Sequence, residues 1–187
     1  IAIIGAGAVG LSIAKYLSEK GQKVLVIEQE SRAGEGISSR NSGVIHAGMY
    51  YPKESLKTKF CIEGNKLLYE YAELKNISHK KTGKFIIASH ENELANLNKI
   101  FLQGKSNGVD LRESTLEEVK KKEPELDIAG ALFSPETGII DVPEFITSLE
   151  GDIQHNHGIV SFNTNFLSAK RNGKALSLIH ISEPTRL

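Results

Sequence analysis

One stretch of the sequence holds most of the side chains that could do chemistry. Residues 38–51 read Ser-Ser-Arg-Asn-Ser-Gly-Val-Ile-His-Ala-Gly-Met-Tyr-Tyr, so hydrogen-bonding groups follow one another along the chain. Arg40 suits a phosphate or a carboxylate, and Asn41 and Ser42 suit a pyrophosphate or the polar edge of a cofactor. His46 is the side chain best suited to move a proton near neutral pH. From residue types alone, a surface or structural role for His46 is an equal alternative.

Other candidate residues have simpler interpretations. Tyr50 and Tyr51 suit substrate contact, but packing is the simpler role for paired tyrosines. Cys61 follows an aromatic residue in an expected helix, so a small core residue is favoured over a redox or cofactor-linking thiol. His155 and His157 lie near an expected helix end without further ligands at suitable spacing. We therefore expect a solvated turn there and no metal site.

A glycine-rich motif opens the chain. The residues after the apolar run 1–4 are Gly5-Ala6-Gly7-Ala8-Val9-Gly10, which match GxGxxG. A helical pattern follows, Gly21 suits its C-terminal end, and the strand-like run 23–28 ends in Glu28. Strand, turn, helix and strand form a βαβ unit that binds a dinucleotide pyrophosphate at the helix N-terminus and a ribose at the acidic residue. The motif alone does not separate NAD from FAD.

The elements that must position these residues alternate along the chain. Helices are expected over residues 56–74, 91–103, 115–122 and 143–155. Strands are expected over 84–89, 129–141 with a Pro-Glu-Thr-Gly turn inside, and 158–163. This alternation predicts an α/β fold. On the helix at 56–74, the side chains expected to be buried are Phe60, Leu67, Leu68 and Tyr71.

Composition narrows the class of protein. Hydrophobic residues make up 40% of the 187, and Lys plus Arg equals Asp plus Glu at 23 each. The chain can form a core, and a neutral chain has no global field to gather nucleic acid, so no nucleic-acid partner is expected. A single cysteine favours a reducing compartment. No apolar run approaches the roughly 20 residues of a membrane span, although peripheral membrane contact stays compatible with the sequence.

Both ends of the chain look cut. Ile1 already lies in a strand pattern. Residues 176–186 read Leu-Ser-Leu-Ile-His-Ile-Ser-Glu-Pro-Thr-Arg, which matches the in-frame translation of a transposase adapter from short-read library preparation. We expect residues 176–187 to be non-native and exclude them from functional argument. Asn172-Gly173 is nevertheless a strong hairpin turn, and residues 175–181 are apolar enough to pair as a strand.

Several motifs together carry a family resemblance. They are the turn at 5–14, the loop at 40–51, the segments at 55–57 and 60–65, and Ser-Pro-Glu-Thr-Gly-Ile-Ile-Asp at 134–141. The chain resembles the L-2-hydroxyglutarate oxidase/dehydrogenase branch of the D-amino-acid-oxidase-like flavoproteins over residues 1–175. The loop and the 134–141 segment are the specific parts, because the glycine motif is shared widely.

The resemblance implies an FAD enzyme that oxidises a small 2-hydroxy acid, L-2-hydroxyglutarate, to 2-oxoglutarate by hydride transfer, with oxygen or a membrane quinone as electron acceptor. It implies a cytoplasmic protein, with peripheral contact at the inner membrane as a further option. His46 would lie near the flavin and act as base. The residues that would bind FAD are Gly5, Gly7, Ala8, Val9, Gly10, Glu28, Arg40, Asn41, Ser42, Gly43 and Val44. The carboxyl-terminal half of the family is missing, so we expect this segment alone to be inactive.

The resemblance also implies a domain plan. A glutathione-reductase-like, Rossmann-like FAD domain would comprise residues 1–78 and 141–175. Residues 79–140 would begin an inserted α+β substrate domain with a mixed sheet. Two alternatives stay open: a sibling enzyme, such as a glycerol-3-phosphate dehydrogenase or an amino-acid oxidase, and a non-catalytic nucleotide-binding module.

Overall fold

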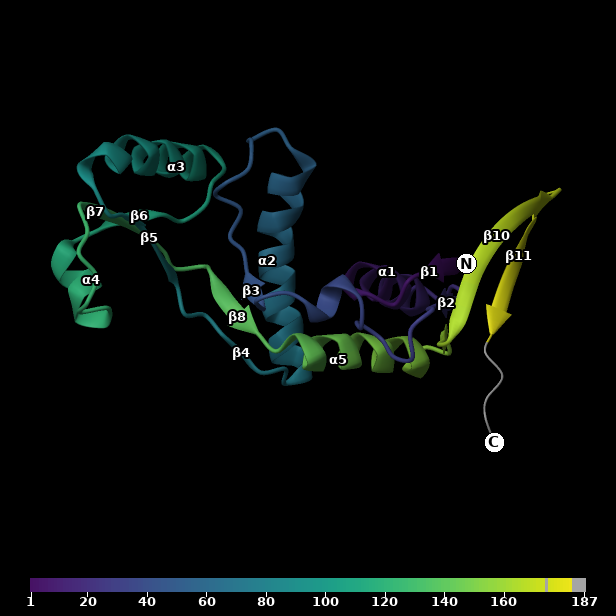
Figure 1. Cartoon of the computed structure of the whole chain (residues 1–187). Coiled ribbons are helices and arrows are strands. Elements are labelled where there is room, and N and C mark those ends of the chain that lie inside the picture. Colours follow the sequence, from purple (N-terminus) through teal and green to yellow (C-terminus); the bar gives the residue numbers. More distant parts are fainter. Residues whose placement is uncertain (174, 183–187) are drawn as a thin grey trace. The chain divides into compact units, whose positions relative to one another are not determined.

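The computed structural model describes residues 1–173 and 175–182 of the chain. The chain divides into two compact units (Figure 1). Unit 1 consists of Ile1–Ser42 and the segment from Asp141 onward, and unit 2 consists of Gly43–Ile140. The expectation that residues 176–187 are non-native lies partly outside the described residues, because 183–187 are not among them.

Unit 1 contains the expected βαβ unit. Strand β1 (Ala2–Ile4), helix α1 (Ala8–Glu19) and strand β2 (Leu25–Ile27) follow one another. The two strands pair in parallel, with Ala2 opposite Leu25. Strand β9 (Ile159–Ser161) joins the other edge of β2, also in parallel, which gives the order β1-β2-β9. The predicted parallel α/β arrangement is therefore confirmed.

Two helices of unit 1 pack side by side (Figure 1). Helix α5 (Val142–His155) begins at Asp141, whose carboxylate accepts a hydrogen bond from the Glu144 backbone N–H at 2.9 Å. It packs against α1. Helix α1 ends as predicted, because Gly21 adopts φ +73° and donates to the Ser18 carbonyl. The buried apolar side chains of this core are Leu11, Ala14, Val26, Ile27, Ile146, Leu149 and Ile153.

A β-hairpin ends the described chain. Strand β10 (Thr164–Asn172) pairs antiparallel with β11 (Ala175–Ser182), as the Asn172-Gly173 turn predicts. Gly173 has φ +59°, the left-handed conformation that such turns favour. Pairing as a strand does not distinguish native from non-native residues, so the origin of residues 176–182 stays a prediction.

Unit 2 has two small antiparallel sheets. One has the order β3-β8-β4, from Val44–Ile45, Gly138–Ile140 and His79–Lys80. The other has the order β5-β7-β6, from Lys84–Ala88, Gly130–Ser134 and Arg112–Ser114. The expectation of a mixed sheet is wrong for the described residues. Strands β5 and β6 run parallel to each other, but β7 lies between them and is antiparallel to both.

The helices of unit 2 match the predicted positions. They are α2 (Leu56–Lys75), the short 3-10 helix η2 (Glu91–Glu93), α3 (Leu94–Ser106) and α4 (Leu116–Lys122). Thr115 caps α4 in a reciprocal capping box with Glu118. Another 3-10 helix, η1 (Ile37–Ser39), lies in unit 1 within the long loop that follows β2.

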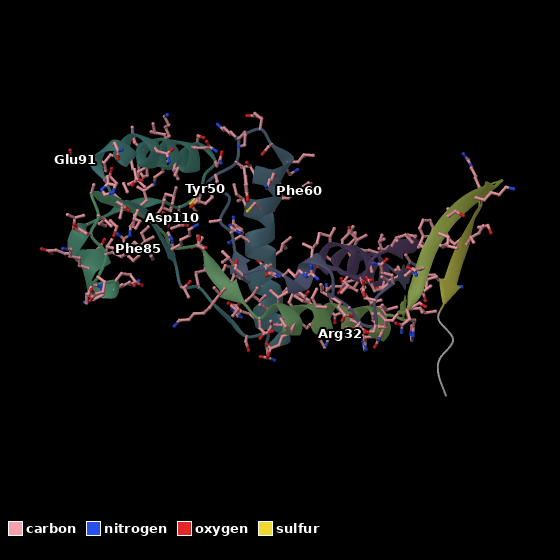
Figure 2. The ribbon with its side chains drawn as sticks, in the orientation of Figure 1. Arg32, Tyr50, Phe60, Phe85, Glu91 and Asp110 are labelled. Carbon is pink, nitrogen blue, oxygen red and sulfur yellow. The ribbon has the colours of Figure 1, made fainter. Side chains whose placement is uncertain are left out.

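The predicted buried face of α2 is wrong for two of its four side chains, Phe60 and Leu67, while Leu68 and Tyr71 are half-buried. Phe60 is 59% exposed (Figure 2) and Leu67 is 63% exposed. The buried side chains of α2 are instead Thr58, Asn65, Tyr69 and Ala72. The hydrophobic pattern misled the prediction because this face is buried through hydrogen bonds: the Asn65 amide and the Tyr69 hydroxyl both donate to the Glu136 carbonyl, at 3.0 and 3.3 Å.

One of the two boundaries between the compact units differs from the expected domain boundary. The boundary between residues 140 and 141 coincides with the expected one, whereas unit 2 begins at residue 43 instead of 79. Strand β3 explains the difference, since Val44 pairs with Ile139 and Ile45 with Gly138. Which functional domain each unit represents stays a prediction.

Gly138 tests the packing that holds unit 2 together. A Cβ atom there would overlap the Tyr69 hydroxyl and the Lys80 carbonyl. We expect Gly138→Ala to lower the free energy of unfolding by about 1–3 kcal/mol, because the surroundings must shift. Gly64→Ala is the matched control, since its Cβ meets nothing within 4 Å and alanine favours the helix. Denaturant unfolding measures both, and equal values for the two variants would contradict the packing described.

Candidate active site

The glycine-rich turn of unit 1 is a tight connection between β1 and α1. Gly5 adopts φ +98°, and its N–H donates to the Ile27 carbonyl at 2.8 Å. A Cβ atom on Gly10 would overlap the Gly5 carbonyl. Glycine is therefore required at both positions, for the turn and for the close approach of helix and strand.

The N-terminus of α1 offers backbone N–H groups to an anion. Gly7 is the N-cap and supplies no side-chain hydrogen bond. The Ala8 N–H donates to the Ser38 hydroxyl at 3.0 Å, and that hydroxyl lies 3.2 Å from where a Gly7 Cβ atom would stand. The sequence reasoning named Ser38 only as one donor in a series, since no spacing rule relates it to the glycine motif. The Val9 side chain, by contrast, is 75% exposed.

Glu28 lies against the same turn. One of its carboxylate oxygens accepts a hydrogen bond from the Ala6 N–H at 2.6 Å, and the other accepts one from the Glu30 N–H at 3.0 Å. An ionised carboxylate has about four acceptor positions. Glu28 can therefore hold the turn and still accept from ribose hydroxyls, which fits a dinucleotide.

The remaining candidates for cofactor contact fall in both units. Arg40, Asn41 and Ser42 end the first segment of unit 1, and all three are exposed. Asn41 donates from its amide to the Ser38 carbonyl, which fixes the chain after η1. Gly43 and Val44 begin unit 2, where the Gly43 carbonyl accepts from the Ile140 N–H at 2.9 Å.

The loop that carries His46 is fixed from α2. The Asn65 amide donates to the His46 carbonyl at 3.1 Å and to the Glu136 carbonyl at 3.0 Å. This single side chain joins the two segments that are most specific to the family resemblance. Residues 47–49 are buried, and Gly48 packs against Ile62 with φ +93°, while His46 and Tyr50 are exposed on either side of them.

The far end of the loop is fixed from α3. The amide of Asn107, the residue that follows the helix, donates to the Gly48 carbonyl at 3.1 Å and to the Tyr51 carbonyl at 2.9 Å. Figure 2 shows Tyr50 between α2 and the sheet of β5, β6 and β7. Neither Asn65 nor Asn107 was a sequence-based candidate, because a buried asparagine has no signature in a hydrophobic pattern.

Two lysines contact the two tyrosines of the loop. The Lys84 ammonium donates to the Tyr50 hydroxyl at 2.9 Å and lies 4.8 Å from the centre of its ring. The Lys57 ammonium lies 4.2 Å from the centre of the Tyr51 ring. We call Tyr50, Tyr51, Lys57 and Lys84 the lysine–tyrosine cluster. Both lysines were missed as site residues, since they come from α2 and β5 and converge only in the folded chain.

The cluster changes the acidity of His46. Partial burial lowers the pKa of His46 below its usual value, and the positive charges of Lys84 and Lys57 lower this pKa further. The imidazole is therefore neutral at neutral pH and free to accept a proton. Cys61, whose thiol lies 3.6 Å from the His46 carbonyl, has a pKa raised chiefly by burial, which favours an unreactive thiol.

The fold and the glycine turn define a dinucleotide-binding domain of the kind that redox enzymes use. Residues 1–183 match the family model described as FAD dependent oxidoreductase (DAO). The chain belongs to this family, and its cofactor is FAD.

Relatives and solved structures agree with this assignment. The chain is 40% identical to the mitochondrial L-2-hydroxyglutarate dehydrogenase of Arabidopsis thaliana, over 94% of this chain and 40% of that protein. It is also 40% identical to the human enzyme of the same name, over 87% of this chain and 36% of that protein. The chain thus spans about 40% of the length of the Arabidopsis relative.

Among solved structures, the L-alpha-glycerophosphate oxidase from Mycoplasma pneumoniae with FAD bound matches with a TM-score of 0.90 at 25% identity, over 98% of this chain and 50% of that chain. Glycine oxidase from Geobacillus kaustophilus matches with a TM-score of 0.86 at 21% identity, over 96% of this chain and 50% of that chain. The second likeness concerns the fold alone. Across residues 1–173 and 175–182, no helix has the length and apolar character to cross a membrane.

Glu28 provides a test of the cofactor site. In the full-length protein, we expect Glu28→Gln to weaken FAD binding by about tenfold, because a charged acceptor bonds more strongly than a neutral one. The measurement is fluorescence titration of the apoprotein with FAD. Glu30→Gln is the matched control, as its exposed carboxylate accepts a hydrogen bond from the neighbouring Gln29 amide and from no other group among the described residues. FAD affinity equal to wild type in Glu28→Gln would remove Glu28 from the site.

Proposed function

We propose that the protein to which this chain belongs oxidises L-2-hydroxyglutarate to 2-oxoglutarate. The observation that carries this proposal is a histidine on a loop fixed by Asn65 and Asn107, with two lysine ammonium groups against the tyrosines of the same loop. The two charges and partial burial lower the pKa of His46, so the combination suits taking a proton from an anionic hydroxy acid. The 40% identity to L-2-hydroxyglutarate dehydrogenases supports the choice of substrate. We also propose oxygen or a membrane quinone as the final acceptor, with cytoplasmic or peripheral inner-membrane placement.

The residues that would hold FAD follow from the geometry of unit 1. The backbone of residues 5–10 would bind the pyrophosphate, because the N-terminus of α1 has a partial positive charge and its N-cap residue, Gly7, has no side chain to occupy the free N–H groups. Glu28 would accept from the ribose. We propose that Arg40, Asn41, Ser42, Gly43 and Val44 line the rest of the cofactor.

The reaction removes two electrons and two protons from the substrate. FAD, when bound, supplies the acceptor for the hydride that leaves C2. The neutral imidazole of His46 accepts the proton of the C2 hydroxyl as the carbonyl forms. Asn65 acts on this step by positioning the His46 backbone. Tyr50 and Tyr51 would contact the substrate through their exposed faces.

A second candidate is the oxidation of glycerol 3-phosphate. The TM-score of 0.90 to an L-alpha-glycerophosphate oxidase favours it. Both substrates are anions that carry an oxidisable hydroxyl carbon, so lysines near a neutral histidine would serve either. Substrate tests on the full-length protein separate the two.

The first test is anaerobic reduction of the bound flavin in the full-length protein. We expect L-2-hydroxyglutarate to bleach the visible flavin band, and D-2-hydroxyglutarate and glycerol 3-phosphate to leave it unchanged. Bleaching by glycerol 3-phosphate alone would establish the second candidate instead. A flavoprotein that none of the three substrates bleaches would refute both.

His46 provides a test of the base. The charged groups that act on it are Lys84 on β5 and Lys57 on α2, and these two lysines contact Tyr50 and Tyr51 of the same loop. Because its pKa is lowered, the rate of flavin reduction should stay level down to a pH below about 6.5 and fall only at lower pH, as the imidazole gains a proton. His46→Gln should reduce this rate by about 10²- to 10⁴-fold.

The pH profile separates catalysis from structure. The residual rate of His46→Gln should lack the acid limb, whereas His155→Gln, at the end of α5, should keep the wild-type profile. Stopped-flow absorbance across pH measures both. An unchanged acid limb in His46→Gln would show that another group is the base.

A further inference from the structure

The lysine–tyrosine cluster brings two ammonium groups to one loop from elements distant in sequence. Lys57 lies in the first turn of α2, and Lys84 is the first residue of β5. Their contacts are with Tyr50 and Tyr51, so both positive charges lie at the end of the loop that carries His46. The two charges also lower the pKa of His46, which places them within electrostatic range of its ring.

Neither of these two lysines forms an ion pair within the part of the chain that the structure describes. Ion pairs there join Lys15 to Glu19, Arg32 to Glu35, Lys81 to Glu136 and Arg112 to Glu118, and none involves Lys57 or Lys84. The nearby Lys81 shows the contrast, because its ammonium lies 2.7 Å from a Glu136 carboxylate oxygen.

Lys57 lies at the N-terminus of α2, where the helix dipole adds to the positive potential of its ammonium group. The first turn of α2 contains no acidic residue. Cations are disfavoured at a helix N-terminus, because the helix dipole is positive there. A lysine at this position is therefore better explained by an anion that binds there than by the stability of the helix.

The fold holds Lys84 in place. Side chains alternate along β5, so Lys84 shares a face with Ile86, which packs against Ala47 and Met49 of the loop. Phe85 and Ile87 face the other way, toward Val119 and Ile128. Lys84 is half-buried as a result, and its ammonium is directed to Tyr50. A half-buried cation of fixed direction binds a carboxylate more strongly than an exposed one does.

We propose that Lys57 and Lys84 are the residues that select a dicarboxylic 2-hydroxy acid over a monocarboxylic one. The inference rests on the proposed function and adds the groups that recognise the second carboxylate. Two ammonium groups match the two charges of such a substrate, whereas a monoanion leaves one ammonium unpaired. The tyrosine rings hold the lysine side chains in place, which reduces the entropy lost on binding.

The test uses the full-length FAD-bound protein and two non-reactive probes. Glutarate and pentanoate share a five-carbon chain, and a methyl group replaces the second carboxylate in pentanoate. Calorimetric titration should show glutarate binding at least about tenfold more tightly to the wild type. Lys57→Met combined with Lys84→Met should abolish this preference. Lys59→Met, two residues further along α2 on an exposed position, should keep it.

Each possible result either supports or overturns the role of the two lysines. Equal affinity of the wild type for the two probes would overturn it, and so would a double variant with the wild-type preference. If the double variant loses FAD, the single variants Lys57→Gln and Lys84→Gln take its place, and a wild-type preference in both overturns the inference. Lys84→Arg, which keeps the charge, should retain most of the preference.

Turnover separates this inference from the proposed function. Glutarate preference without bleaching by L-2-hydroxyglutarate would uphold selection of a dicarboxylate and refute the proposed substrate. Bleaching without glutarate preference would uphold the substrate and refute the role of the two lysines.

Discussion

The buried amide of Asn65 donates two hydrogen bonds, to the His46 carbonyl and to the Glu136 carbonyl, and unit 2 is organised around this pair. The first bond fixes the loop after β3, and the second fixes the turn between β7 and β8. Pairing of β3 with β8 follows from bringing these segments together. A buried carbonyl without a donor costs about 1–3 kcal/mol, so the two bonds favour this arrangement over alternatives.

Positive charge is the second constraint on unit 2. Lys57 and Lys84 disfavour the protonated imidazole of His46, so the same charges that would attract an anion also favour the neutral form of this side chain. In the proposed function, substrate recognition and proton transfer would therefore depend on the same two positive charges. In unit 1, by contrast, the proposed anion site at the start of α1 would consist of backbone N–H groups rather than charged side chains.

The local sequence predicted the elements well where short-range rules decide. The glycine turn, the end of α1 at Gly21 and the hairpin at Asn172-Gly173 depend on residues within a few positions of one another. The buried face of α2 was predicted wrongly, because Asn65 and Tyr69 bury polar groups whose partners come from a distant turn. Hydrophobic spacing carries no information about such partners.

The sequence by itself determined the βαβ unit, the glycine positions, the acidic residue that follows β2 and the loop that carries His46. These features depend on backbone conformation and residue type, which neighbours in the chain define. Only the tertiary structure decided that Ser38 meets the N-terminus of α1, that Asn65 and Asn107 fix the loop, and that Lys57 and Lys84 surround it. The reason is physical: hydrogen bonds and Coulomb interactions depend on distances in space, which chain folding sets independently of sequence separation.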